Sequence, residues 1–160
     1  MSEPVKELIV QDVVDAINAI TTANGFQQTL VAQRPIRGNM DAEKNAQNGT
    51  VLVIQGDEEE NDAYSPEGNP KGQGWTMPIY LEVFIVAEHG DTTTPLDKLA
   101  NRAEADIIKK LSEDRHRGGH AQDTLFTPTE RRTDGPDATG LLMRIDTIYA
   151  TSEQDPYTER

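Results

Sequence analysis

The chain contains no cysteine, so it forms no disulfide and offers no thiolate for catalysis or metal binding. Hydrophobic residues make up only 35% of its 160 residues and aromatic residues 5%, which predicts a thin core with long polar loops around it. Basic residues are also scarce: 15 Lys and Arg stand against 28 Asp and Glu, a formal net charge of -13. This charge repels phosphate backbones and anionic lipid, so we expect neither nucleic-acid nor membrane binding as the main activity.

Long apolar runs are missing as well. No stretch approaches the length of a membrane span, and the N-terminus, Met1-Ser2-Glu3-Pro4, lacks the basic and apolar regions of a secretory signal. We therefore expect a protein that is made and folded in a cytoplasm without export by these signals.

Two segments have the periodicity of amphipathic helices. The first runs from Pro4 to Asn24, where apolar residues recur every three or four positions and Asn24-Gly25 supplies a stop. The second runs from Thr94 to about Asp114, with Thr94 as the expected cap and Pro95 at the first helical position. Its apolar stripe is narrow and consists of Leu96, Leu99, Ala103, Ile107 and Leu111.

Four segments are typical of strands, namely 29–34, 50–55, 75–88 and 141–151. The element order is then α-β-β-β-α-β over a single domain of residues 1–160. This order predicts an α+β fold: a mostly antiparallel sheet of about four strands, with two helices packed on one face. The segments 35–49, 57–74 and 115–138 are polar and rich in Gly, Pro or charge, and we expect them to be mobile loops.

No convincing catalytic signature is present, and we expect neither an active site nor a cofactor. The strongest candidate for chemistry is the pair His116 and His120, which has the spacing of two metal ligands on a helix. Gly118-Gly119 interrupts any helix there and no third ligand is fixed, so a polar loop explains the pair more simply. The acidic run from Asp57 to Asp62 lacks the Gly and Glu positions of an EF-hand calcium loop.

The order and ends of the elements resemble those of the tail terminator or tail completion proteins of long-tailed bacteriophages. The similarity is carried by the N-terminal helix, a strand that ends in Arg34-Pro35, the long central strand Tyr80 to Val86, and a second helix. The final strand Met143 to Tyr149, closely followed by Asp155-Pro156-Tyr157, completes it.

This resemblance implies a structural virion protein, not an enzyme, that is assembled in the host cytoplasm and located in the neck region of the phage tail. It implies a ring, usually of six subunits, at the head-proximal end of the tail tube. The ring ends tube polymerisation and offers a surface to the head-tail connector or head completion protein. DNA would pass through the acidic lumen without specific binding, and no membrane is involved.

On this reading, sheet edges and the 57–74 and 115–138 loops form the contacts between subunits and with the tube. Arg131 and Arg132 are the expected charged anchors, and Trp75, Tyr149 and Tyr157 are aromatic candidates. Trp75 and Tyr149 fit a core position equally well. Two alternatives stay open: a small metal-dependent or acid-base enzyme that uses His116 and His120, and a monomeric adaptor of a phage-like contractile or secretion system.

Overall fold

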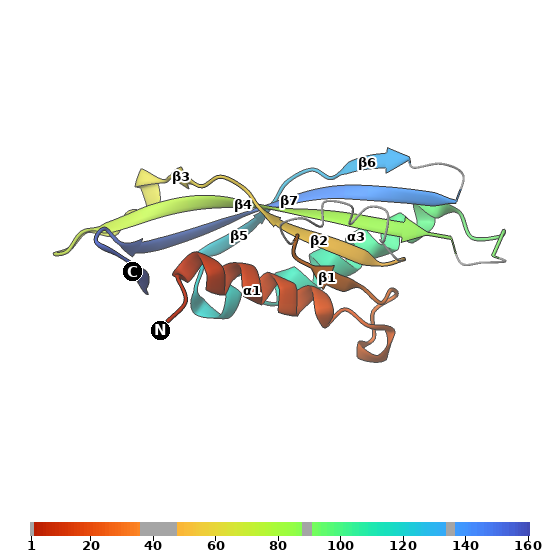
Figure 1. Cartoon of the computed structure of the whole chain (residues 1–160), viewed down its shortest axis with the longest axis horizontal. Coiled ribbons are helices and arrows are strands. Elements are labelled where there is room, and N and C mark those ends of the chain that lie inside the picture. Colours follow the sequence, from red (N-terminus) through yellow and green to blue (C-terminus); the bar gives the residue numbers. More distant parts are fainter. Residues whose placement is uncertain (1, 36–47, 88–90, 134–136) are drawn as a thin grey trace.

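The structure, a computed structural model, describes residues 2–35, 48–87, 91–133 and 137–160. Its centre is a pair of long antiparallel strands, β4 (Gly72–Val86) and β7 (Ala138–Ser152), which pair along their full lengths. Two helices of the described residues, α1 (Val5–Asn18) and α3 (Leu96–Glu113), lie on the same side of this ribbon (Figure 1). The chain is therefore α+β, with the helices forming one layer and the sheet the other.

The remaining strands extend the ribbon on both sides. β2 (Thr50–Gln55) pairs with β4 and carries β1 (Val31–Gln33) at its outer edge, while β5 (Asp123–Phe126) lies along β7. Three short strands pair with the ends of the ribbon: β3 (Glu59–Glu60) with β4, and both β6 (Glu130–Thr133) and β8 (Asp155–Glu159) with β7.

The expectation of about four mostly antiparallel strands, in the order α-β-β-β-α-β, is wrong. Over the described residues the sheet has eight strands, and it is mixed because β1 runs parallel to β2. The stretch 34–49 between them is long enough for the crossover that a parallel pair requires. β3, β6 and β8 were missed because they are short and polar, and each pairs with one neighbour only, so no apolar alternation marks them.

The expected loops also differ from what the structure contains. Segment 57–74 includes β3, the 3-10 turn η2 (Asp62–Tyr64) and the first residues of β4, and 115–138 includes η3 (Arg117–Gly119), β5 and β6. The expected loop 35–49 lies largely outside the described residues. Much of the sequence in the other two is therefore regular structure held by backbone pairing, and Ala121 and Phe126 of the second segment also pack in or against the core.

Both helices are shorter than the sequence suggested. α1 ends at Asn18, and a separate 3-10 turn, η1 (Thr22–Asn24), follows because the Thr21 hydroxyl accepts a hydrogen bond from the Asn24 backbone N–H at 3.2 Å. Gly25 ends this turn with a left-handed φ of 84°. The expected Thr94 cap is wrong: α3 begins after Pro95 with no side-chain cap.

The core lies between the helices and the facing side of the sheet. Alternate residues of β4 from Met77 to Ile85 point toward the helices, and so do Leu141, Met143 and Ile145 of β7. All of these side chains are buried, together with the α1 stripe that begins at Val5 and Ile9. Within the part of the chain that the structure describes, neither helix is long and apolar enough to cross a membrane.

Candidate functional site

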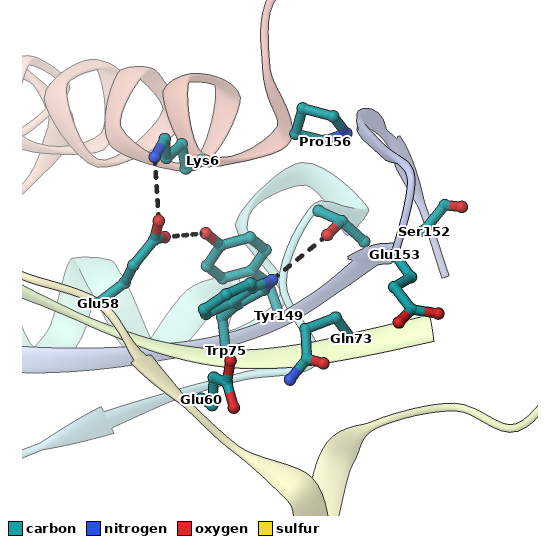
Figure 2. A pocket seen from close by; sticks show the side chains of 10 residues that line it. Lys6, Glu58, Glu60, Gln73, Trp75, Tyr149, Ser152, Glu153 and Pro156 are labelled. Atoms are coloured by element: carbon teal, nitrogen blue, oxygen red, sulfur yellow. Dashed lines mark hydrogen bonds and ion pairs between the residues drawn. The ribbon is translucent and has the colours of Figure 1, made fainter. Parts of the chain in front are cut away.

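A hollow of about 330 Å³ opens on the helix side of the sheet, beside the start of α1. Its floor is made by Trp75 of β4 and Tyr149 of β7, which lie directly opposite each other in the β4–β7 register. Figure 2 shows the indole of Trp75 lying across the tyrosine ring, with Lys6, Pro156 and Glu153 around the opening. The structure therefore brings two of the aromatic candidates together in one site.

The Tyr149 hydroxyl donates a hydrogen bond to the carboxylate of Glu58, and the same carboxylate pairs with Lys6 Nζ at 3.0 Å. Tyr149 is only 3% exposed, so burial raises its pKa above the ordinary value of a phenol, and the Glu58 carboxylate raises it further. This chain of contacts joins α1, the segment before β3 and the end of β7. Tyr149 is thus both a core residue and part of the wall of the hollow.

Trp75 is less deeply enclosed. Its indole Nε1–H donates to the Thr151 hydroxyl at 3.3 Å, which holds the ring across the floor. Glu60 lies directly opposite Trp75 in the β3–β4 pairing, and Glu153 follows the end of β7. Both carboxylates are exposed, and the described residues supply no ion pair to either of them.

The backbone of the 61–65 turn comes very close to Gly74, and this close contact holds β3 beside β4. Gly74 accepts a hydrogen bond from the Asn61 N–H at 2.8 Å, and its own N–H donates to the Ser65 hydroxyl at 2.9 Å. A Cβ at position 74 would lie 2.7 Å from the Tyr64 carbonyl carbon, so only glycine lets the 61–65 turn pack this closely. The glycine thereby sets the position of Glu60 beside Trp75.

Arg131 and Arg132 lie on β6, near the other end of β7, and point to opposite faces of the sheet. Arg131 faces α3, where it contacts Asn101 and pairs with Glu104 at 3.3 Å. Arg132 lies on the far face and pairs with Glu82 at 2.8 Å. Their side chains are 45% and 52% exposed, so both pairs are surface pairs of small energetic value.

Tyr157 does not join the hollow. It lies on β8 with 51% of its surface exposed, while its neighbour Pro156 lines the opening. The structure therefore separates this third aromatic candidate from Trp75 and Tyr149.

The two candidate metal ligands flank η3, and His120 contacts the carboxylate of Glu159 on β8. Over the described ranges, no three His, Asp or Glu side chains are grouped so that they could hold a metal ion. Arg117, the first of the three residues between them in sequence, is unexpectedly buried. It is 1% exposed, contacts the Leu111 carbonyl and lies 3.3 Å from Asp12 of α1.

Sequence reasoning missed Lys6, Glu58, Glu60 and Glu153 as parts of one site. The acidic run 57–62 was visible, but nothing in it indicates that β3 pairs with β4 beside Trp75. Comparison of the sequence with protein-family models and with curated proteins gives no match.

Proposed function

We propose that this chain is a structural virion protein that forms a ring at the head-proximal end of a phage tail tube. The ring ends tube polymerisation and presents the surface to which the head attaches. The resemblance of its N-terminal helix, long central strand, second helix and long final strand to those of tail terminator and tail completion proteins motivates the proposal. In it the chain acts by contact, and no chemical step is assigned to it.

The observation that carries the proposal is the placement of two unlike surfaces at opposite ends of one ribbon. Arg131 and Arg132 lie on β6, which pairs with β7 around Leu141. The acidic hollow lies at Tyr149 to Glu153. At about 3.3 Å per strand residue, these points on β7 are roughly 30 Å apart. Figure 1 shows β6 and β3 near opposite ends of the sheet.

Two half-exposed arginines at one end, on opposite faces of the sheet, and an acidic hollow at the other end suit a head-to-tail contact between identical subunits. Contacts of this heterologous kind generate closed rings when the rotation between subunits closes. Attraction between these arginines and the carboxylates of the hollow would favour the correct register over wrong pairings. The net charge of -13 further supports a lumen through which DNA passes without binding.

Electron microscopy of the purified chain, alone and mixed with tail tubes of the phage that encodes it, tests the proposal. We expect a ring-shaped cap at one end of each tube, whether or not free rings form beforehand. Arg132→Glu should reduce capping, whereas Lys98→Glu, the same charge change at an exposed lysine of α3, should leave it intact. Tubes that stay uncapped by the unaltered chain would favour a monomeric adaptor.

A further inference from the structure

The hollow beside Trp75 has an aromatic floor that the charge pairing of the proposed ring does not explain. It combines an aromatic floor with three carboxylates, those of Glu58, Glu60 and Glu153, and a single ammonium group, that of Lys6. We infer that this hollow is a recognition pocket for a cationic side chain, an arginine or a lysine presented by a protein partner. The inference stands on the geometry of the pocket and does not depend on the proposed ring.

The aromatic floor is the first argument. The face of an indole ring carries negative electrostatic potential, and tryptophan is the best partner for a cation placed over an aromatic ring. Among the described residues, the cation–ring contact present is that of Lys109 with Phe26, at 4.9 Å from the ring centroid. Trp75 has no such contact there, although its ring lies at the floor of an open hollow.

The second argument is the charge that the chain leaves unbalanced. Lys6 is directed to Glu58, which also accepts the hydrogen bond from Tyr149, so this carboxylate is satisfied within the fold. Glu60 and Glu153 border the same hollow on different sides of Trp75 (Figure 2). A guanidinium or ammonium group over the indole would therefore meet the ring face and two carboxylates together.

The third argument is size and access. About 330 Å³ is at the lower end of the range of small-ligand pockets, so one long side chain suits the volume better than a large ligand. The hollow lies between exposed β3 and β8 at the end of the sheet, where a partner can approach. Arginine is the stronger expectation of the two cations, because its planar group both stacks on aromatic rings and binds carboxylates.

The single tryptophan of the chain makes the test direct, because its fluorescence reports on this site alone. The probe is the peptide acetyl-Gly-Arg-Gly-amide, and the control peptide carries citrulline, a neutral isostere, in place of arginine. We expect a saturable change in Trp75 fluorescence with the arginine peptide, weakened by added salt, and no saturable change with the citrulline peptide.

Matched variants locate the binding. Glu60→Gln and Glu153→Gln should each weaken the binding of the arginine peptide about twofold to fivefold, the range expected for the loss of one exposed charge. Glu59→Gln is the control, since it removes the same charge from the neighbouring residue of β3, whose side chain lines a hollow on the opposite face of the sheet. Equal responses to both peptides, no saturable response, or an equal loss in Glu59→Gln would overturn the inference.

Discussion

The carboxylate of Asp106 on α3 accepts a hydrogen bond from the backbone N–H of Gln27, at 2.9 Å, across 79 positions of sequence. The same oxygen accepts the N–H of Gln28 at 2.8 Å. Asp106 is only 4% exposed, so it fixes the chain between α1 and β1 against the second helix.

Asp106→Ala should therefore lower the free energy of unfolding by about 1–3 kcal/mol, because it leaves two backbone donors without their acceptor. Urea denaturation monitored by circular dichroism measures the change. Asp106→Asn keeps an acceptor oxygen in nearly the same volume and should lower the free energy of unfolding by less than Asp106→Ala does. Equal stability of the alanine variant and the unaltered chain would show that the two N–H groups find other partners.

The raised pKa of Tyr149 predicts that the fold loses stability at alkaline pH. Its pKa is raised in the folded state by burial and by Glu58, whereas in the unfolded chain a tyrosine ionises near pH 10. Above about pH 10 the unfolded state loses a proton that the folded state retains. The contribution of Tyr149 to the free energy of unfolding therefore falls as pH rises.

Tyr149→Phe removes the titrating group and should flatten this alkaline loss. It should also lower the free energy of unfolding by about 1 kcal/mol at neutral pH through the lost hydrogen bond to Glu58. Urea midpoints at pH 8 and pH 11 for both proteins provide the measurement. Parallel pH dependences would contradict the assignment of the alkaline loss to Tyr149.

Gly74 sets the distance between the 61–65 turn and β4. We expect Gly74→Ala to destabilise the fold by about 1–3 kcal/mol, since the added methyl group meets backbone atoms rather than a flexible side chain. It should also change the emission of Trp75, because β3 must shift relative to the ring. Thr76→Ala, which removes only the hydrogen bond from Asn61 Nδ2 at 2.8 Å, should leave the emission nearly unchanged.

Arg117 is a buried cation between α1 and α3. Arg117→Met should lower the free energy of unfolding by about 2–3 kcal/mol, since it removes the hydrogen bond from a charged donor to the Leu111 carbonyl and the contact with Asp12. Burial raises the pKa of Asp12 and Arg117 lowers it, so removing the arginine should raise this pKa further.

A carbon-detected NMR titration of the Asp12 carboxyl measures that shift. Arg117→Lys retains the positive charge and should leave the pKa of Asp12 closer to its value in the unaltered chain. A lower pKa of Asp12 in the methionine variant would show that Arg117 does not stabilise this carboxylate.

These residues also show how far sequence reasoning reaches. The apolar stripe of α1 and the alternation along β4 and β7 follow directly from burial on one face, so the positions of these elements were predictable. The edge strands were not, because β3, β6 and β8 are held by backbone pairing and carry polar side chains. The complete strand order therefore could not be predicted without knowledge of which strands pair.

The candidate site was predictable only in part. Trp75 and Tyr149 stood out as rare aromatic residues in an acidic chain, but their pairing depends on the β4–β7 register. Lys6 and Glu58 are 52 positions apart, and Asp106 and Arg117 look like ordinary surface charges until their burial is known. Charged residues that serve the core give no local signal, because their partners are distant in sequence.

The most direct test of the proposed function is electron microscopy of lysates from a phage or prophage that lacks this chain. The proposal predicts abnormally long tail tubes and finished heads separated from tails. Long tubes would indicate a role in termination, and headless tails of normal length would indicate a role in joining. Intact particles with tails of ordinary length would contradict the proposal.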